Sequence, residues 1–244
     1  MSDNPAARSW GARAAMDGLT RGVMYQVFLR SFTLEGTLRA ATERLQGLAE
    51  LGVGVLYLTP ICLQDDDTCR EFWSARQQLS EMDNPKNPYR IKDYYTIDPE
   101  YGTDDDLRDF ADRAHELGMR VILDIVFMHC GPTANFIEEH PAFVQRDEQG
   151  VVINGDYNFP LLNFGCAELR EYLWKNLEYW MTNFGVDGYR CDVSGAIPLD
   201  FWEEARRRLE AINPEVLMLS EGSRKEDQLF AFDLNYNSEL SLAA

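Results

Sequence analysis

Short runs of apolar residues alternate with longer amphipathic stretches along most of this chain. The purest runs have the length of a strand: Val53 to Pro60, Met119 to Met128, Val186 to Val193 and Val216 to Glu221. Continuous apolar runs are typical of strands that are covered on both faces, as in a parallel sheet. A less regular run, Val23 to Phe32, comes before them, and Phe230 to Asn235 follows them. We therefore predict six strands in one sheet.

The stretches between these runs carry apolar residues at steps of three and four, which is the spacing of one helix face. The predicted helical patterns are Leu38 to Leu48, Leu107 to Leu117, Leu169 to Trp180 and Phe201 to Ile212. Thr103 stands before three aspartates, which predicts a capped helix start with an acidic first turn. Gly118 and Gly185 stand where a helix end favours a left-handed residue, and a predicted strand follows each of them.

Strands and helices therefore alternate, with short helix-to-strand turns and long connections at residues 61–102 and 129–167. This order predicts the α/β class and a (β/α)₈ TIM barrel that is incomplete, with about six of its eight strands. The connection 129–167, after the third strand, is predicted to form a small inserted subdomain. We predict one partial-barrel domain over residues 22–244, preceded by a flexible leader at 1–21. Because active sites of such barrels lie on the loops after the strands, the long loops mark the functional end.

Three acidic residues, Asp124, Asp192 and Glu221, stand at or near the ends of three successive predicted strands. Strand ends meet at one rim of a barrel, so these carboxylates are expected to face one another across a pocket. Arg190 is two positions before Asp192, which places both side chains on one face of the strand. We expect the guanidinium to keep Asp192 ionised, as a nucleophile requires, and the apolar strand before Glu221 to favour a protonated donor. Two carboxyl groups tuned in opposite ways can cleave a glycosidic bond.

Two other interpretations fit parts of this pattern. A single aspartate at a strand end is more often a helix cap or a surface group than a catalyst. Three carboxylates on successive barrel strands could also hold Mg²⁺ for enolate chemistry. That chemistry needs a lysine base on a neighbouring strand, which Val53 to Pro60 does not offer, and Arg190 would repel a cation from the same face. The joint placement of the acids with Arg190 therefore favours glycoside chemistry.

The motifs around these residues resemble signatures of the α-amylase family of glycoside hydrolases, in the family's order, from about Gly22 onward. The segment Asp124 to His129 (DIVFMH) resembles the first signature, and Gly188 to Asp192 (GYRCD) resembles the second. Glu221, which follows a predicted strand and precedes a glycine, resembles the third. The stretch Asn87 to Thr103 resembles the family's sequence before the first signature.

This resemblance implies a retaining α-glucoside hydrolase or transglucosylase that acts on α-glucans or related oligosaccharides. It implies that Asp192 is the nucleophile and Glu221 the acid/base, and that Tyr89 is an aromatic platform under the sugar ring. We expect no cofactor. The residues that the resemblance assigns to substrate binding are Arg190, His129, Asp124 and Tyr89.

Several positions depart from the family's pattern. Met128 stands where the family usually has a calcium-binding asparagine, and a thioether is a poor ligand for a hard cation, so we expect no metal to be needed for folding. Gly195 and Ala196 replace a Lys-His pair that often follows the nucleophile and contacts the leaving-group side of the substrate, and Leu162 replaces the acid of another short family motif. The product-side specificity is therefore open. The run Asp65 to Asp67 is interpreted as a solvated loop, with a cation site as the alternative.

The family's fourth signature, a His-Asp pair after the seventh strand, has no match after Tyr236. The chain then carries a nucleophile and a proton donor without the acid that stabilises the transition state. A catalytically silent sugar-binding or structural fragment is therefore the alternative, and the choice between hydrolysis and transfer stays open. The unpaired edges of the first and sixth strands predict self-association and negligible activity for the chain alone.

Charge and composition exclude partners rather than name one. The formal net charge of −18 repels phosphate backbones and anionic lipids, so we expect no nucleic-acid or membrane partner, and a neutral carbohydrate fits better. The chain has no apolar run long enough to span a bilayer and no secretory signal at its start. Its five cysteines form no CxxC pair, which argues against disulfides and a zinc site and predicts a reduced, cytoplasmic setting.

Overall fold

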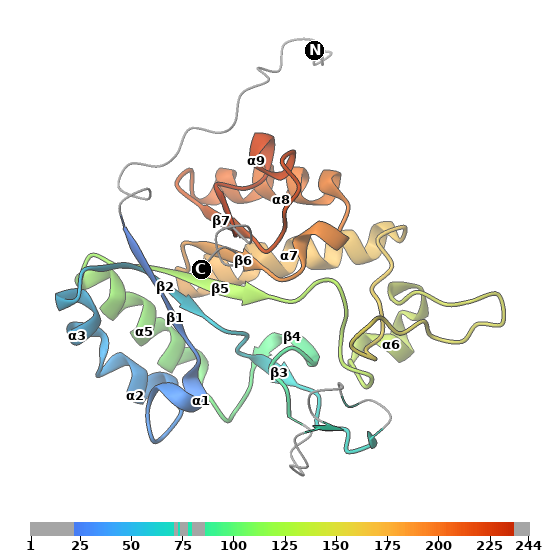
Figure 1. Cartoon of the computed structure of the whole chain (residues 1–244), viewed down its shortest axis with the longest axis horizontal. Coiled ribbons are helices and arrows are strands. Elements are labelled where there is room, and N and C mark those ends of the chain that lie inside the picture. The colour runs from blue at the N-terminus through green and yellow to red at the C-terminus, as the bar shows by residue number, and fades with distance from the viewer. Residues whose placement is uncertain (1–21, 71–72, 74–77, 80–85, 237–244) are drawn as a thin grey trace.

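The computed structural model of the chain describes residues 22–70, 73, 78–79 and 86–236. Within them, six parallel strands form one curled sheet in the order β1-β2-β5-β6-β7-β8 (Figure 1). These strands are β1 (Val23–Val27), β2 (Val53–Leu58), β5 (Arg120–Ile125), β6 (Gly188–Cys191), β7 (Leu217–Ser220) and β8 (Leu234–Asn235). The sheet is an incomplete (β/α)₈ barrel, so the predicted fold is confirmed. The predicted leader at 1–21 lies outside the described residues.

The helices follow the strands along the chain and pack on one another beside the sheet (Figure 1). Helix α2 contacts α5, α5 contacts α7, and α7 contacts α8. The helices are α1 (Leu29–Phe32), α2 (Leu38–Thr42), α3 (Leu45–Glu50), α5 (Asp104–Glu116), α6 (Phe136–Glu139), α7 (Ala167–Phe184), α8 (Leu199–Ile212) and α9 (Asp227–Phe230), with 3₁₀ turns at Pro141–Phe143 and Ser194–Ala196. No described helix combines the length and the apolar character that a membrane crossing requires.

The strand predicted over Val23 to Phe32 is too long. The carbonyl of Phe28 accepts hydrogen bonds from the amides of Ser31 and Phe32, both 3.0 Å long, and these bonds start helix α1. Leu29, the first residue of α1, is fully buried. Apolar character alone could not separate a strand end from a short buried helix, because both bury the same kind of side chain.

Two other elements differ from the sequence prediction. The helix predicted over Leu38 to Leu48 is divided into α2 and α3, because the amide of Arg44 bonds to the carbonyl of Ala41, three residues back, and tightens the chain there. The connection 61–102 contains an antiparallel hairpin, β3 (Cys62–Gln64) and β4 (Ile91–Ile97), which the prediction missed. The polar residues of β4 hide its strand character in the sequence.

The predicted helix boundaries are confirmed at three positions. The Thr103 hydroxyl accepts from the amide of Asp106, and the Asp106 carboxylate accepts from the amide of Thr103, which is a complete capping box. Gly118 and Gly185 have φ values of 76° and 64°. Both lie in the left-handed region, where a side chain would be strained, so glycine ends α5 and α7 and lets β5 and β6 follow.

Side chains alternate between the two faces of the sheet. Outward positions such as Leu56, Leu58 and Val121 join the large core under the helices. The inward positions form a second, smaller cluster of Val55, Tyr57, Ile122, Leu217 and Leu219. Because the alternation continues to the strand ends, it decides which polar residues face the inside of the half-barrel.

The connection 129–167 contains little regular secondary structure. It contains α6 and a 3₁₀ turn, and antiparallel bridges join His129 to Leu161 and Val144 to Leu162. These bridges fold the segment back on itself and bring Leu161 beside His129. That it forms an inserted subdomain of its own stays a prediction.

Candidate active site

The carboxyl edge of the sheet gathers the acidic residues that the sequence singled out. Asp124 on β5 and Arg190 on β6 are direct partners in the strand register. Asp124 follows the inward residue Ile122 by two positions, and Arg190 pairs with Asp124 on one side and with the inward residue Leu219 on the other, so both side chains share the inner face. Asp192 stands one residue past β6 and Glu221 one residue past β7, at the rim where parallel strands end.

Arg190 binds all three carboxylates. Its Nη1 lies 2.8 Å from Asp124 Oδ1 and 2.6 Å from Asp192 Oδ1. Its Nη2 lies 2.6 Å from Glu221 Oε2, and only 5% of the Arg190 side chain is exposed. Burial works against the charged guanidinium, but Asp124 and the other neighbouring acids raise the pKa of Arg190 above its ordinary value. Arg190 is therefore a permanent cation at the centre of the cluster.

Two tyrosine hydroxyls bind the remaining oxygen of Asp124. Tyr57 and Tyr89 both donate to Asp124 Oδ2, at 2.8 and 2.9 Å. Burial raises the pKa of both phenols, so both stay protonated donors. Tyr89 is half-buried and its ring packs partly against the core. The sequence prediction did not include Tyr57, although its inward position near the end of a predicted strand was a usable signal.

His129 fixes the backbone of the turn that carries Tyr89. Its Nε2 lies 3.0 Å from the carbonyl oxygen of Tyr89. Burial lowers the pKa of His129 to about 4, so the ring is neutral at physiological pH. Because a carbonyl can only accept, the geometry assigns the proton to Nε2. Nδ1 is then a buried acceptor, and it has no hydrogen-bond partner among the described residues.

The protonation of Asp192 differs from the sequence prediction. Burial, followed by the charge of Asp124, raises the pKa of Asp192 to about 7, although Arg190 acts in the opposite direction. Burial likewise raises the pKa of Asp124 to about 6. The expectation that Arg190 keeps Asp192 ionised is therefore wrong for this arrangement, because burial and the charge of Asp124 outweigh the effect of the guanidinium. Near neutral pH the cluster tends to retain a proton.

Glu221 does not lie in apolar surroundings, as the strand before it had suggested. Its Oε2 binds Arg190 and also accepts from the amide of Val193 at 3.0 Å. Its side chain is 36% exposed. The apolar residues of β7 are buried, whereas Glu221 stands beyond the end of the strand, at the rim.

Val193, the residue after Asp192, has a strained backbone. Its φ of 42° and ψ of 39° lie in the left-handed region, which a β-branched residue rarely adopts. Such a conformation costs about 1–3 kcal/mol and persists only where its surroundings impose it. Here the turn lets the Val193 amide reach Glu221. The strain is thus located between the two carboxylates that the sequence analysis selected.

The close approach of β7 explains why the segment Gly188 to Asp192 begins with a glycine. A Cβ at Gly188 would lie 1.9 Å from the carbonyl oxygen of Leu217, the next strand's paired residue. A side chain there would force β6 and β7 apart. The glycine therefore keeps Arg190 and Glu221 on strands close enough to form their ion pair.

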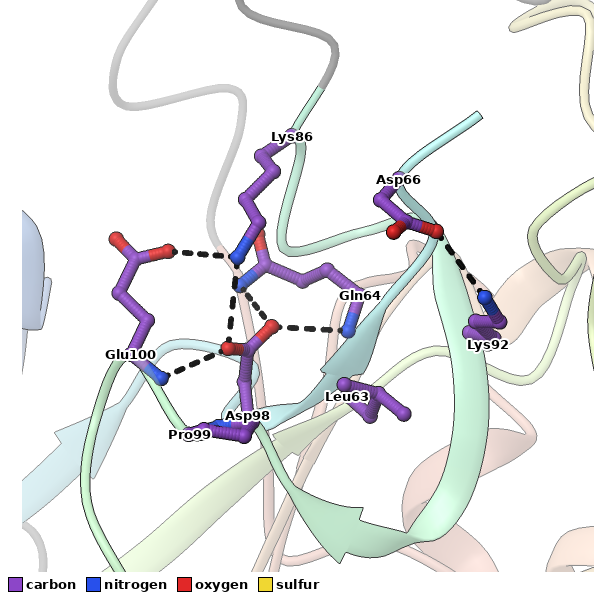
Figure 2. Close-up of a pocket in the computed structure, with 8 residues that line it drawn as sticks. All are labelled: Leu63, Gln64, Asp66, Lys86, Lys92, Asp98, Pro99 and Glu100. Atoms are coloured by element: carbon purple, nitrogen blue, oxygen red, sulfur yellow. Dashed lines mark hydrogen bonds and ion pairs between the residues drawn. The ribbon is translucent and has the colours of Figure 1, made fainter. Parts of the chain in front are cut away.

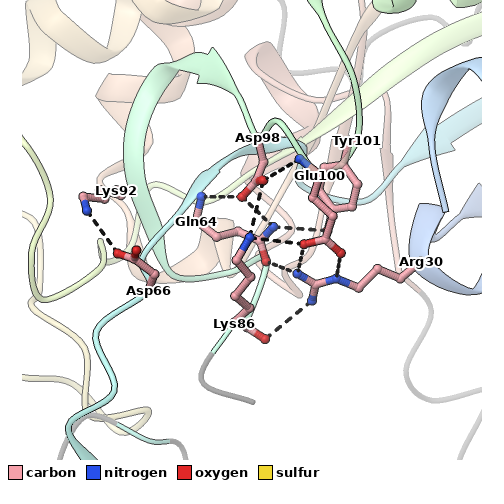
Figure 3. A network of polar contacts seen from close by, with 8 residues as sticks. All are labelled: Arg30, Gln64, Asp66, Lys86, Lys92, Asp98, Glu100 and Tyr101. Carbon is pink, nitrogen blue, oxygen red and sulfur yellow. Dashed lines mark hydrogen bonds and ion pairs between the residues drawn. The ribbon is translucent and has the colours of Figure 1, made fainter. Parts of the chain in front are cut away.

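A cavity of about 460 Å³ lies beside the β3–β4 hairpin, not at this cluster (Figure 2). Its charged groups bind one another. Arg30 binds both carboxylate oxygens of Glu100, at 2.5 and 2.8 Å, and Lys86 lies 3.4 Å from Glu100 and 3.6 Å from Asp98 (Figure 3). Gln64 bonds to both Arg30 and Asp98. These contacts form a structural network beside the hairpin, which we call the brace; its residues are Arg30, Gln64, Lys86, Asp98 and Glu100.

The brace holds one side of the turn that carries Tyr89, since Lys86 precedes that residue by three positions. A buried ion pair holds the other side, with Arg90 Nη2 3.2 Å from Asp65 Oδ1. Asp65 also accepts from the amide and hydroxyl of Thr133. The interpretation of Asp65 as part of a solvated loop is wrong, because its side chain is fully buried in these contacts.

A metal centre does not emerge from this arrangement. Within the described parts of the chain, no three His, Cys, Asp or Glu side chains are grouped to hold a metal ion. The Arg190 guanidinium also fills the space between the acids that Mg²⁺ would need in the enolate alternative. Folding without calcium stays a prediction.

A parallel strand-and-helix sheet with carboxylates at its carboxyl edge places this chain among the (β/α)₈-barrel proteins. Residues 12–149 match the sequence model of the α-amylase catalytic domain. The chain belongs to this family. The match includes Tyr89, Asp124 and His129 and ends before Asp192.

The similar proteins are longer than this chain. The chain is 31% identical over 211 residues to a cyclomaltodextrinase from a Bacillus species, covering 76% of this chain and 33% of the relative. An α-amylase from Lactobacillus plantarum has a similar structure, with a TM-score of 0.79, 36% identity, and coverage of 90% of this chain and 53% of its own. A maltogenic α-amylase from Thermotoga neapolitana gives a TM-score of 0.79 at 30% identity, with 92% and 51% covered. The chain thus spans about a third of the curated relative and half of the solved ones.

Proposed function

We propose that this half-barrel carries the nucleophile and the acid/base of a retaining α-glucoside hydrolase or transglucosylase. The observation that supports this best is the sharing of Arg190 by Asp192 and Glu221, each 2.6 Å from a guanidinium nitrogen. A retaining mechanism needs its two carboxyl groups about 5–5.5 Å apart, and a common guanidinium keeps them close. The relatives, named as a cyclomaltodextrinase and α-amylases, support an α-glucan or oligosaccharide as substrate.

In this proposal, Asp192 attacks the anomeric carbon while Glu221 gives its proton to the glycosidic oxygen. The leaving sugar departs, and a covalent glucosyl-Asp192 ester remains. Glu221 then removes a proton from water, or from a sugar hydroxyl, as the oxygen of that acceptor bonds to the anomeric carbon. The bond from this carbon to Asp192 breaks at the same time, which frees the Asp192 carboxylate and leaves Glu221 protonated again. Water as the acceptor gives hydrolysis and a sugar as the acceptor gives transfer, which the described residues leave open.

The neighbouring residues fit supporting roles in the same scheme. The bare Nδ1 of neutral His129 can accept a hydrogen bond from a sugar hydroxyl. The half-buried ring of Tyr89 can lie under a sugar ring, with its hydroxyl held by Asp124. Because the pKa of Asp192 is raised to about 7, its proton must leave before attack. A bound substrate that breaks the ion pair between Glu221 and Arg190 would let Arg190 bind Asp192 more strongly. This would favour loss of the Asp192 proton.

A mechanism-based label can test the nucleophile. The chain would be completed with the C-terminal barrel segment of the Lactobacillus plantarum relative and incubated with 5-fluoro-α-glucosyl fluoride, which forms a long-lived glycosyl ester. Peptide mass mapping is expected to locate the ester on Asp192. Asp200→Asn, an exposed change on α8, serves as the matched control and should label normally. A folded chimera that labels at another carboxylate, or not at all, would overturn the proposal.

The second candidate is a catalytically silent, sugar-binding or structural chain. The described sheet has six strands, and the Glu221 carboxylate already binds Arg190 and the amide of Val193. In that case the folded chimera would bind a maltooligosaccharide without forming the ester. The label therefore separates the two candidates.

We further propose that the isolated chain associates with itself through its open edge strands. On β1, Val23 and Tyr25 are 49% and 37% exposed, and an unpaired strand edge offers free N–H and C=O groups. Sedimentation velocity is expected to show concentration-dependent oligomers. Val23→Lys should reduce them, whereas Val151→Lys, at an apolar position that is 61% exposed and lies away from the edge, should not. A monomer at all concentrations would contradict this expectation.

We also propose a cytoplasmic location. All five cysteines are free thiols in the structure, and Cys130 and Cys191 are buried. Free thiols persist in a reducing compartment. A neutral carbohydrate remains the proposed partner, because the net charge of −18 disfavours nucleic acid and anionic membranes.

A further inference from the structure

The guanidinium of Arg190 has tyrosine neighbours besides the three carboxylates. Its Nε donates to the hydroxyl of Tyr236 at 3.2 Å, and the Tyr236 ring centroid lies 5.6 Å from the guanidinium carbon. The ring centroid of Tyr57 lies 5.8 Å from the same carbon. Two aromatic rings, from distant parts of the chain, therefore flank one cation.

The strand register explains how Tyr236 reaches this position. Tyr236 directly follows β8, whose Asn235 pairs with Ser220 of β7. The next residue on each strand is therefore Tyr236 on one and Glu221 on the other, so both stand at the same level of the rim. Gln228 of α9 bonds to the Asn235 side chain at 2.8 Å and anchors the end of β8.

Every nitrogen of Arg190 then has a partner. Nη1 binds Asp124 and Asp192, and Nη2 binds Glu221. Rotation of the planar guanidinium would exchange these partners, so something must fix the plane. The groups placed to do so are the Tyr236 hydroxyl, which binds Nε, and the two flanking rings. Among the described residues, the ion pairs with carboxylates are made by Nη1 and Nη2.

We propose that Tyr57 and Tyr236 form an aromatic clamp that fixes the plane of Arg190, and that Tyr236 is a positioning residue of the site. The clamp presents Nη1 to Asp192 and Nη2 to Glu221 at the same time. Its contribution to catalysis rests on the proposed function, but its effect on Asp192 does not. A looser guanidinium would share its charge less favourably with Asp192, and the carboxylate would hold its proton to a higher pH.

Tyr236→Phe tests the clamp in the full 244-residue chain, because it removes only the acceptor on Nε and keeps the ring. NMR titration of ¹³Cγ-labelled aspartate, with the Asp192 signal assigned by Asp192→Asn, measures the midpoint directly. The midpoint is expected to rise by about 0.5–1 pH unit, in line with the partial loss of a charge-assisted hydrogen bond. The Nε–H proton of Arg190 should also exchange with solvent roughly tenfold faster, since it loses its acceptor. The charged and titratable groups facing Asp192 are Asp124 from β5, Arg190 from β6, Glu221 after β7 and Tyr89 before β4. Tyr57 from β2 and Tyr236 after β8 act on Asp192 through their contacts with Arg190.

Tyr95→Phe is the matched control, because the Tyr95 hydroxyl donates to the carbonyl of Tyr172 instead of touching the acidic cluster. It should leave both the midpoint and the Nε–H exchange of Arg190 unchanged. If Tyr236→Phe lowers the melting temperature and moves neither readout, Tyr236 is merely structural and the clamp is refuted. Neither readout needs turnover, so a shifted midpoint without ester formation in the labelled chimera would refute the proposed function and leave the clamp standing.

Discussion

Asp192→Asn is expected to abolish glycoside cleavage by the completed enzyme, lowering kcat by about 10⁴-fold or more. The amide that replaces the carboxylate cannot form the glycosyl ester, and it also loses the charge that Arg190 holds at 2.6 Å. Release of reducing sugar from a maltooligosaccharide measures the effect. KM should change much less than kcat, because His129 and Tyr89 are untouched.

Asp200→Asn provides the control for this loss, since it makes the same chemical change at a side chain that is 68% exposed and pairs with Arg170 on the helix layer. Its kcat should equal that of the parent chimera. An Asp192→Asn chimera that keeps more than about a hundredth of the parent's kcat would show that another group is the nucleophile, because removal of a nucleophile is rarely so mild.

The same substitution is expected to stabilise the fold at high pH. Burial raises the pKa of Asp192 from its ordinary 3.8 to about 7, so its contribution to stability is fully present below pH 3.8 and is lost as the pH rises through about 7. At pH 8 the folded chain carries a buried charge that Asn would remove. With about 1.4 kcal/mol per pKa unit, the gain is on the order of 2–4 kcal/mol at pH 8.

Urea unfolding of the parent and the Asp192→Asn chain at pH 4 and pH 8 measures this gain. The two free energies of unfolding should be similar at pH 4 and should separate as the pH rises through 7. His129 acts oppositely, since its pKa is lowered to about 4 and its contribution is lost as the pH falls, but both chains share it. Equal stability at pH 8 would mean that Arg190 compensates the charge of Asp192 completely.

These two expected outcomes concern the same carboxylate, Asp192. If both are observed, Asp192 is needed for turnover and unfavourable for folding, which would indicate a site whose electrostatics are set by function. The strained Val193 between Asp192 and Glu221 indicates the same. Stabilising substitutions at these positions should therefore cost activity.

The sequence by itself determined the alternation of strands and helices and the boundaries set by Thr103, Gly118 and Gly185. It also determined that Asp124, Arg190, Asp192 and Glu221 meet at one rim. These features depend on the periodicity of the side chains and on the fact that parallel strands end together, so local pattern suffices. The β3–β4 hairpin was missed because its stability comes from pairing across the connection, which no local pattern records.

Only the tertiary structure decided how charge is shared within the cluster. The sequence paired Arg190 with Asp192, whereas the fold gives the same guanidinium to Asp124 and Glu221 as well. It also buries Asp192 beside the charge of Asp124, and these two effects raise the pKa of Asp192. The placement of Tyr57 and Tyr236 on either side of Arg190 likewise depends on strand order. Protonation and orientation are set by burial and by the sum of all neighbouring charges, and those distances exist only once the strands have been brought side by side.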